Sequence, residues 1–194
     1  MQPDPFIATV FLLLTFFIAG IAQVIWLKSD ASKGFTRRLD GGRMVRGRPL
    51  FGPNKTWRGF MVMVPAIAIL FAVFGGGRAW FGPAYTDALW ALSTVQYALL
   101  GAWVGFAFML AELPNSFVKR QLDVSAGSAP DHPQLRTLCF LVDQVDSVVG
   151  SLIALALCVP VPALVWLYCI FGGMFLHWLF NVLLKLLGMK TRAA

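Results

Sequence analysis

The sequence predicts an all-α membrane protein: a polytopic helical bundle with about five transmembrane helices, its N-terminus outside and its C-terminus in the cytoplasm. Three observations predict this class. Hydrophobic residues make up 58% of the 194 residues and charged residues 13%, whereas a soluble domain has about 25% charged residues. Five apolar runs are long enough to cross a bilayer, and the basic residues gather on one side of these runs.

The predicted spans follow from the length of the apolar runs. A bilayer core of about 30 Å requires about 20 apolar residues in a helix that rises roughly 1.5 Å per residue. Pro160 and Pro162 predict a tight turn between the last two runs. No linker or repeat divides the chain, so we expect a single integral membrane domain over residues 1–194. The runs cover residues 6–27, 59–75, 88–111, 138–159 and 163–187.

Basic residues set the predicted orientation. Residues 28–58 contain nine Lys or Arg and two acidic residues, which equals the whole net charge of +7. Lys and Arg accumulate in cytoplasmic loops, so 28–58 is predicted to be a basic cytoplasmic loop and 112–137 a second one. Only Arg78 falls in a loop on the other side. The remaining basic residues are Lys119, Arg120, Arg136, Lys185, Lys190 and Arg192.

The most informative motif is a pair of carboxylates inside the fourth apolar run. Asp143, Asp146, Ser147 and Gly150 recur at i, i+3, i+4 and i+7, so they share one helical face. An Asp at the centre of a membrane helix costs about 2.5 to 3.5 kcal/mol on the insertion scale, and two adjacent anions also repel. Asp143 and Asp146 are therefore predicted to hold Mg²⁺, which proteins usually bind through one or two carboxylates and substrate phosphates. An ion pair with Lys119, Arg120 or a neighbouring helix, or one protonated carboxyl, is the alternative.

A second polar group, residues 112–120, follows the third span. Asn115 or Ser116 is expected to cap a short helix, whose N-terminus favours anions. Ser116, Lys119 and Arg120 would then share a face that binds phosphate. The alternative is a helix cap followed by two basic residues whose side chains reach the cytoplasmic membrane interface. If this segment is considered alone, that alternative is preferred to a phosphate-binding face.

A third polar group, residues 51–59, stands directly before the second span. A turn is predicted at its start, and the segment is expected to contact phosphates at the membrane face. It is not a Walker loop, because Pro53 replaces the lysine that would follow the second glycine. The residues available to a phosphate are Asn54, Lys55, Thr56 and Gly59.

Other polar residues receive a simpler interpretation. Five arginines of the basic loop are expected to hold anionic membrane lipids, at about 1 kcal/mol each near the surface. No aromatic platform interleaves them, so nucleic acid is not an expected partner. His177 and Asn181 share a face of the fifth span, but an interhelical hydrogen bond explains them at least as well as a site does. The five arginines are Arg37, Arg38, Arg43, Arg46 and Arg48.

The order and spacing of the three polar groups resemble a known family. Residues 54–59, 114–120 and 143–147 together are similar to the CDP-archaeol synthase family, which is related to the phosphatidate cytidylyltransferases. The resemblance covers about residues 39–150 and the five-span layout. It implies an enzyme of phospholipid biosynthesis in the cell membrane that uses CTP and Mg²⁺. This enzyme would transfer a cytidylyl group to the phosphate of a glycerol lipid, release pyrophosphate and have its active site on the cytoplasmic side.

The resemblance also implies roles for individual residues. Asp143 and Asp146 would hold the metal. The electrostatics of the proposed reaction, not the resemblance, suggest that Glu112 binds a second ion or orients Lys119. Gln144 stands where the phosphatidate enzymes have Arg, which favours the archaeol-type branch, although ether and ester tails both fit these motifs. The phosphate-binding residues would be Lys55, Lys119 and Arg120, and the hydrogen-bonding and small residues Asn54, Thr56, Gly59 and Ser116.

A cation- or proton-coupled transporter that uses Asp143 and Asp146 is the main alternative, since intramembrane carboxylates carry such ions. Transporters often contain inverted repeats and discontinuous helices near the midplane. Neither is clear in this chain. A homo-oligomer is compatible with the sequence.

Overall fold

The computed structural model describes residues 2–188, except for the side chains of Arg78 and Ala79. Lys190 and Arg192 of the predicted basic tail therefore lie outside the described residues, as does the side chain of Arg78. The elements in chain order are α1 (Pro5–Lys28), the 3-10 helix η1 (Asp30–Phe35), β1 (Met44–Val45), β2 (Arg48–Pro49), α2 (Trp57–Gly76), α3 (Arg78–Phe81), α4 (Pro83–Thr86), α5 (Thr94–Gln121), α6 (Pro133–Ala156) and α7 (Ala163–Leu186).

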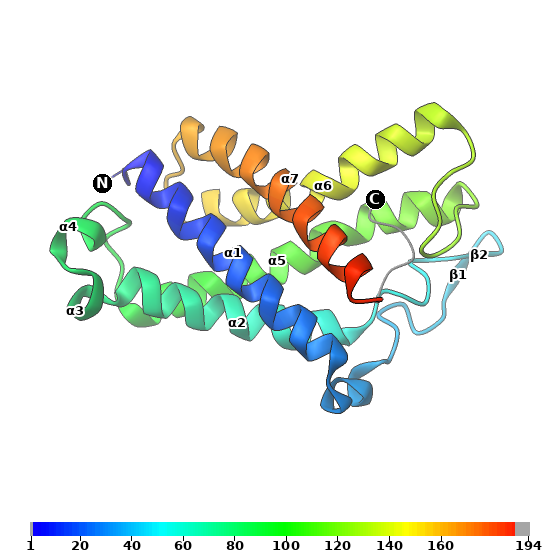
Figure 1. The fold of residues 1–194 in the computed structure, drawn as a ribbon, viewed down its shortest axis with the longest axis horizontal. Coiled ribbons are helices and arrows are strands. Elements are labelled where there is room, and N and C mark those ends of the chain that lie inside the picture. The colour runs from blue at the N-terminus through cyan, green and yellow to red at the C-terminus, as the bar shows by residue number, and fades with distance from the viewer. Residues whose placement is uncertain (1, 189–194) are drawn as a thin grey trace.

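The predicted all-α bundle is confirmed. Helices α1, α2, α5, α6 and α7 are long and apolar enough to cross a membrane. β1 and β2 pair antiparallel and form the one sheet in the described part of the chain. The start of α1, with α3 and α4, lies at one end of the bundle, and the β1–β2 hairpin lies at the other (Figure 1). The chain is thus a multi-pass membrane protein, and its orientation in the membrane stays a prediction.

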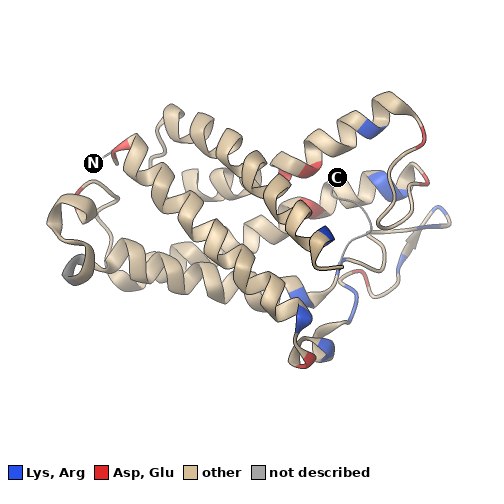
Figure 2. Cartoon of the chain, viewed as in Figure 1, with Lys and Arg blue, Asp and Glu red and all other residues tan. Residues whose placement is uncertain are grey.

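Charged side chains are distributed unevenly along the bundle. Lys and Arg gather at the hairpin end, on the segment between α1 and α2 and on the adjoining ends of α5, α6 and α7 (Figure 2). The middle of the bundle is almost free of charge in this view. The basic residues of the sequence thus gather toward one end of the helices (Figure 2).

Helix α5 is the central helix, because it packs along α2 on one side and along α6 on the other. Gly101 of α5 faces α2 at backbone distance: a Cβ there would lie 2.7 Å from the carbonyl oxygen of Ile67 and 2.9 Å from Cα of Ala68. On the other side, Gly150 of α6 packs against Ala111 with no room for a Cβ. Small residues let membrane helices approach closely where apolar burial gives no driving force. These contacts fix α5 relative to both neighbours.

Aromatic side chains close the end of the bundle opposite the hairpin. Phe11 of α1 packs edge-on against Phe71 of α2, with ring centroids 4.7 Å apart. The Tyr97 hydroxyl donates to the carbonyl of Trp90 at 2.7 Å, and the Trp90 indole donates to the carbonyl of Pro160 at 2.8 Å. Each buried polar atom of these rings thereby has a partner, as burial requires.

The third span differs from its predicted bounds. It was expected over 88–111, but α5 begins at Thr94, where Ser93 and Gln96 form a capping box. The helix then continues to Gln121. Because α6 also begins early, at Pro133, residues 112–137 do not form one loop: only 122–132 connects the two helices.

The expected cap at Asn115 or Ser116 is wrong, because both lie inside α5. A new short helix was expected to begin just after Pro114, at a cap on Asn115 or Ser116. A proline removes one helical hydrogen bond, yet membrane helices tolerate it where neighbouring helices supply other partners. Here α5 is packed between α2 and α6, and it continues through Pro114. The polar residues after the proline therefore extend the face of the spanning helix.

The close approach of α5 to α2 leads to a stability prediction. Gly101→Ala should lower the thermal unfolding temperature of the detergent-solubilised protein, because overpacking against backbone atoms costs about 1–3 kcal/mol. Gly34 in η1 has open space around its Cβ position, so Gly34→Ala is the matched control and should change stability by about 0.5 kcal/mol or less. Equal unfolding temperatures for the two variants would contradict the packing described here.

Candidate functional site

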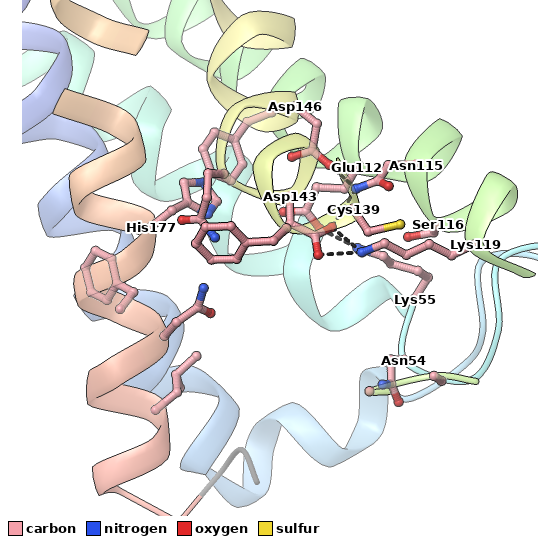
Figure 3. A pocket seen from close by; sticks show the side chains of 18 of the residues that line it. Asn54, Lys55, Glu112, Asn115, Ser116, Lys119, Cys139, Asp143, Asp146 and His177 are labelled. Carbon is pink, nitrogen blue, oxygen red and sulfur yellow. Dashed lines mark hydrogen bonds and ion pairs between the residues drawn. The ribbon is translucent and has the colours of Figure 1, made fainter. Parts of the chain in front are cut away.

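A cavity of about 650 Å³ lies at the hairpin end of the bundle. Helices α1 and α7 supply a mostly apolar wall, whereas α5, α6 and the segment before α2 supply the charged wall. Figure 3 shows the charged side chains converging on this space from three separate segments. Its charged and amide-bearing residues on those segments are Asn54, Lys55, Glu112, Asn115, Lys119, Arg120, Arg136, Asp143, Gln144 and Asp146.

Two helical faces build the charged wall. On α5, Glu112, Asn115 and Lys119 follow one another at i, i+3 and i+7, so they point the same way. On α6, Asp143 and Asp146 share one face, as their spacing predicted, and this face meets α5. The close packing of α5 and α6 beyond these residues brings the two faces within hydrogen-bonding distance.

Asn115 bridges the two aspartates. Its side-chain Nδ2 donates to Oδ1 of Asp143 at 2.6 Å and to Oδ2 of Asp146 at 2.9 Å. Lys119 forms an ion pair with Asp143 in which its ammonium contacts both carboxylate oxygens (Figure 3). The ion pair that the sequence left as an alternative is therefore present, and the two like charges share donors from α5.

A second ion pair lies beside the first. The Lys55 ammonium is 2.5 Å from Oε2 of Glu112, and the Ser147 hydroxyl lies 3.2 Å from Oε1 of the same carboxylate and 3.1 Å from Oδ1 of Asp146. Burial alone would lower the pKa of Lys55, but the charge and hydrogen bond of Glu112 outweigh it and raise that pKa. Lys55 is therefore cationic at neutral pH. Glu112 contacts Lys55, not Lys119.

The donor set fits a divalent ion. No group of three or more His, Cys, Asp or Glu side chains that could hold a metal occurs within residues 2–188. Mg²⁺, however, commonly binds through only one or two carboxylates and completes its shell with waters and phosphate oxygens. Asn115 holds Asp143 and Asp146 adjacent, so this pair is the candidate to hold such an ion.

Arg120 differs from the two lysines. Its side chain packs over the backbone of Gly52, where a Cβ would lie 3.3 Å from Cδ of Arg120. Gly52 also has a φ of +94°, which glycine adopts without strain. The Nε of Arg120 is buried and has no hydrogen-bond partner among the residues that the structure describes. A buried donor without a partner is unfavourable, so this guanidinium is available to an anion.

The other predicted site residues separate into two groups. Ser116 is buried and lines the large cavity. Asn54 also lines this cavity but is exposed. Thr56 and Gly59 instead line a smaller cavity of about 120 Å³ next to it. Gly59 lies inside α2 with Met109 against it, so its small size serves helix packing.

Asp40, which the sequence did not single out, fixes the segment that carries Asn54 and Lys55. Its buried carboxylate accepts hydrogen bonds from the backbone N–H groups of Gly42 at 2.8 Å, Phe51 at 3.0 Å and Gly52 at 3.2 Å. Burial acts to raise the pKa of Asp40, but these N–H groups together with Arg38 outweigh it, so the pKa lies below its ordinary value. The signal in the sequence was an acid directly before Gly41 and Gly42 in a mostly basic loop.

The hairpin is also tied to α5. Arg48 contacts the carbonyl of Gln121 and the carboxylate of Asp123. Arg48 was expected to hold lipid headgroups with the other arginines, but this pairing directs it toward the protein. The N–H of Leu39 donates to the carbonyl of Lys55 at 2.9 Å. The basic loop therefore has a defined fold that presents Lys55 to the cavity.

Sequence reasoning also left out residues that line the cavity. Asn115 was considered only as a cap, although its i+3 spacing from Glu112 would have placed it on the site face of a longer helix. His177 and Asn181 of α7 line the cavity, and the His177 ring stacks on Phe108 with centroids 6.0 Å apart. Their i and i+4 spacing was the available signal.

Fold and cavity together define a polytopic α-helical membrane protein with a carboxylate–ammonium network at one end of its bundle. Residues 4–193 match the family model described as CarS-like, CDP-archaeol synthase. The chain therefore belongs to the CDP-archaeol synthase family.

Curated relatives agree with the family model. CDP-archaeol synthase of Halobacterium salinarum strain R1 is 37% identical over 128 residues, which are 66% of this chain and 63% of the relative. The match thus spans less than two thirds of that relative's length. CDP-archaeol synthase of Thermococcus onnurineus is 30% identical over 162 residues, or 81% of this chain and 83% of the relative. No solved structure matches.

The Asp40 contacts lead to a pH-dependent prediction. Asp40→Asn should destabilise the protein by about 1–3 kcal/mol at pH 7, because a carboxylate that accepts three N–H groups is lost. Since the folded-state pKa is lowered, the stabilisation is present above the ordinary value of 3.8 and is lost as the pH falls through the lowered pKa. Thermal unfolding of both proteins at pH 7 and near pH 3 measures this.

Asp30→Asn is the matched control for that experiment, because Asp30 lies on the same loop and its side chain is 91% exposed. Its unfolding temperature should stay near that of the wild type at both pH values. A difference between wild type and Asp40→Asn that persists unchanged at low pH would contradict the role of the carboxylate.

Proposed function

We propose that this protein transfers the cytidylyl group of CTP to the phosphate of a glycerol lipid and releases pyrophosphate. The product would be a CDP-activated lipid of the CDP-archaeol or CDP-diacylglycerol type, used in phospholipid biosynthesis. Family membership supports this chemistry. One observation supports the proposal most strongly. Asp143 and Asp146, which Asn115 bridges, line the same cavity as three cationic side chains. These are Lys55, Lys119 and Arg120.

The chemistry requires charge stabilisation more than proton transfer. An anionic oxygen of the lipid phosphate attacks the α-phosphorus of CTP, the bond to the bridging oxygen breaks, and pyrophosphate leaves with that oxygen. The attacking oxygen is already ionised, so no general base is required. The catalytic problem is to bring two polyanions together in line and to stabilise the charge that develops on the leaving group.

Individual residues suit these tasks. Lys55 and Lys119 carry flexible ammonium groups, and the fixed guanidinium of Arg120 can bind phosphate oxygens in a bidentate manner. Asp143 and Asp146 are the residues that would hold Mg²⁺. Bound there, Mg²⁺ would supply positive charge to the phosphates and orient them. The number of ions and any metal role of Glu112 stay outside the proposal.

Smaller side chains complete the proposed phosphate site. Ser116 and Asn54 are at the large cavity and would donate hydrogen bonds to phosphate oxygens. Thr56 forms a backbone bridge with Arg38 next to Lys55, and we assign it hydrogen bonding at the edge of the site. Gly59 is assigned only to the packing of α2.

The cavity walls support an acceptor that comes from the bilayer. The wall formed by α1 and α7 is largely apolar, which suits the chains of a lipid whose phosphate reaches the charged wall. We place the charged end of the bundle on the cytoplasmic side of the cell membrane, because Lys and Arg accumulate on that side. CTP would then enter from the cytoplasm. The apolar residues of this wall include Phe16, Val24, Leu27, Leu176, Phe180 and Leu184.

The test is incorporation of labelled CTP into lipid by the purified protein with Mg²⁺. An unsaturated ether phosphate of the archaetidic type and phosphatidic acid are offered side by side. Wild type should label at least one acceptor, and Asp143→Asn should reduce kcat by about 100-fold or more, because a metal-holding carboxylate is removed. Asp30→Asn, which lies outside the cavity, is the matched control and should retain wild-type activity.

The acceptor that is labelled identifies the lipid class. If folded protein forms no labelled product from either acceptor, the assignment as a cytidylyltransferase is contradicted. Uptake of protons or cations by reconstituted vesicles would then be measured, because a transporter is the remaining explanation for the intramembrane carboxylates.

A further inference from the structure

We propose that Lys119 is an internal counter-ion of the carboxylate pair, which a divalent ion displaces and thereby releases for phosphate binding. The inference rests on the proposed function and adds an order of binding to it, with the metal ion before the phosphate. Without the ion, Lys119 neutralises Asp143. With the ion, Lys119 becomes a free cation in the cavity, so the lipid or nucleotide phosphate gains the Lys119 ammonium as a binding partner only after the metal site is filled.

The hydrogen bonds that Asp143 and Asp146 accept support this inference. Both oxygens of Asp143 accept from the Lys119 ammonium, and Oδ1 also accepts from Asn115. Oδ2 of Asp146 accepts from Asn115, and Oδ1 accepts from the backbone N–H of Ser147. Every carboxylate oxygen of the pair thus has a protein donor. A metal ion that binds Asp143 must compete with a donor that is already in place.

Lys119 is the donor that a cation displaces most readily. Asn115 and Ser147 are neutral, so a nearby positive charge does not repel them as it repels an ammonium. The lysine side chain has a flexible stem, which lets its charge leave one partner for another. Its side chain is 15% exposed and lines the cavity, so a phosphate in that cavity is within reach of the released ammonium.

Two other cations of the wall, Lys55 and Arg120, are arranged differently. Lys55 is paired with Glu112, outside the bridged pair. Arg120 contacts neither Asp143 nor Asp146 through any hydrogen bond or ion pair within the described residues, and its buried Nε has no partner there. Arg120 therefore has the same charge as Lys119, in the same cavity and one residue further along α5, without the contact that the proposal requires. This makes it a matched control.

The first experiment measures Mn²⁺ binding by electron paramagnetic resonance, without nucleotide or lipid. Lys119→Gln should tighten Mn²⁺ binding by about tenfold or more, because the competing ion pair is removed and a partly buried carboxylate is left unpaired. Arg120→Gln removes the same charge and should tighten binding by about threefold or less, since it acts only through screened, longer-range electrostatics. Asp143→Asn should abolish the tightening when combined with Lys119→Gln.

Equal tightening by Lys119→Gln and Arg120→Gln would overturn the proposal, because net charge alone would then explain the effect. Failure of wild type and Lys119→Gln to bind Mn²⁺ would also overturn it. Neither result decides the proposed function, which the incorporation of labelled CTP by the wild type tests separately.

The second experiment uses the wild type and so does not depend on the folding of a variant. Acetic anhydride labels free amines, and mass spectrometry reports the extent at each lysine. Saturating Mg²⁺ should increase labelling of Lys119 by about threefold or more, because ion-paired ammonium groups are protected, and should change Lys55 less. Unchanged labelling of Lys119 under conditions where the metal binds would contradict displacement.

Discussion

The bridge from Asn115 to Asp143 and Asp146 is the interaction on which the described site depends. Two carboxylates on one face of an apolar helix repel each other and lose water. The amide of Asn115 contacts both, and the ammonium of Lys119 neutralises one of them. α6 can therefore carry an acidic pair into a membrane bundle only because α5 presents donors opposite it. That pairing leaves both carboxylates adjacent at the wall of the cavity.

The rest of the fold serves to hold these two faces together. Gly101 lets α5 approach α2, and Gly150 lets α6 approach α5, so the central helix cannot move away from either neighbour without losing close packing. Asp40 fixes the basic loop through three backbone N–H groups, and this loop delivers Lys55 to Glu112. Three segments that are distant in sequence therefore bring their charges to one cavity. Close helix packing positions α5 and α6, and the hydrogen bonds of Asp40 position the basic loop.

The fold class was predictable because apolar length and the distribution of basic residues depend on local sequence. The face of Asp143 and Asp146 was predictable for the same reason, since helical spacing determines it. The extension of α5 past Pro114 was not, because only packing between α2 and α6 decides that this proline stays in the helix. The role of Asp40 was also hidden, since its partners are backbone groups whose positions appear only after the loop has folded. The contribution of α7 to the cavity was also not predictable, because it depends on how the helices pack against one another.

The measurement that tests the central claim most directly is equilibrium binding of CTP to the purified protein, with and without Mg²⁺, by isothermal titration calorimetry. If the bridged aspartates hold an ion that binds phosphate, Mg²⁺ should tighten CTP binding by about tenfold or more. Asp146→Asn should remove that gain while the protein keeps its wild-type unfolding profile. CTP binding that is equally tight with and without Mg²⁺, or a gain that survives in Asp146→Asn, would contradict the assignment of this network as a metal-dependent phosphate site.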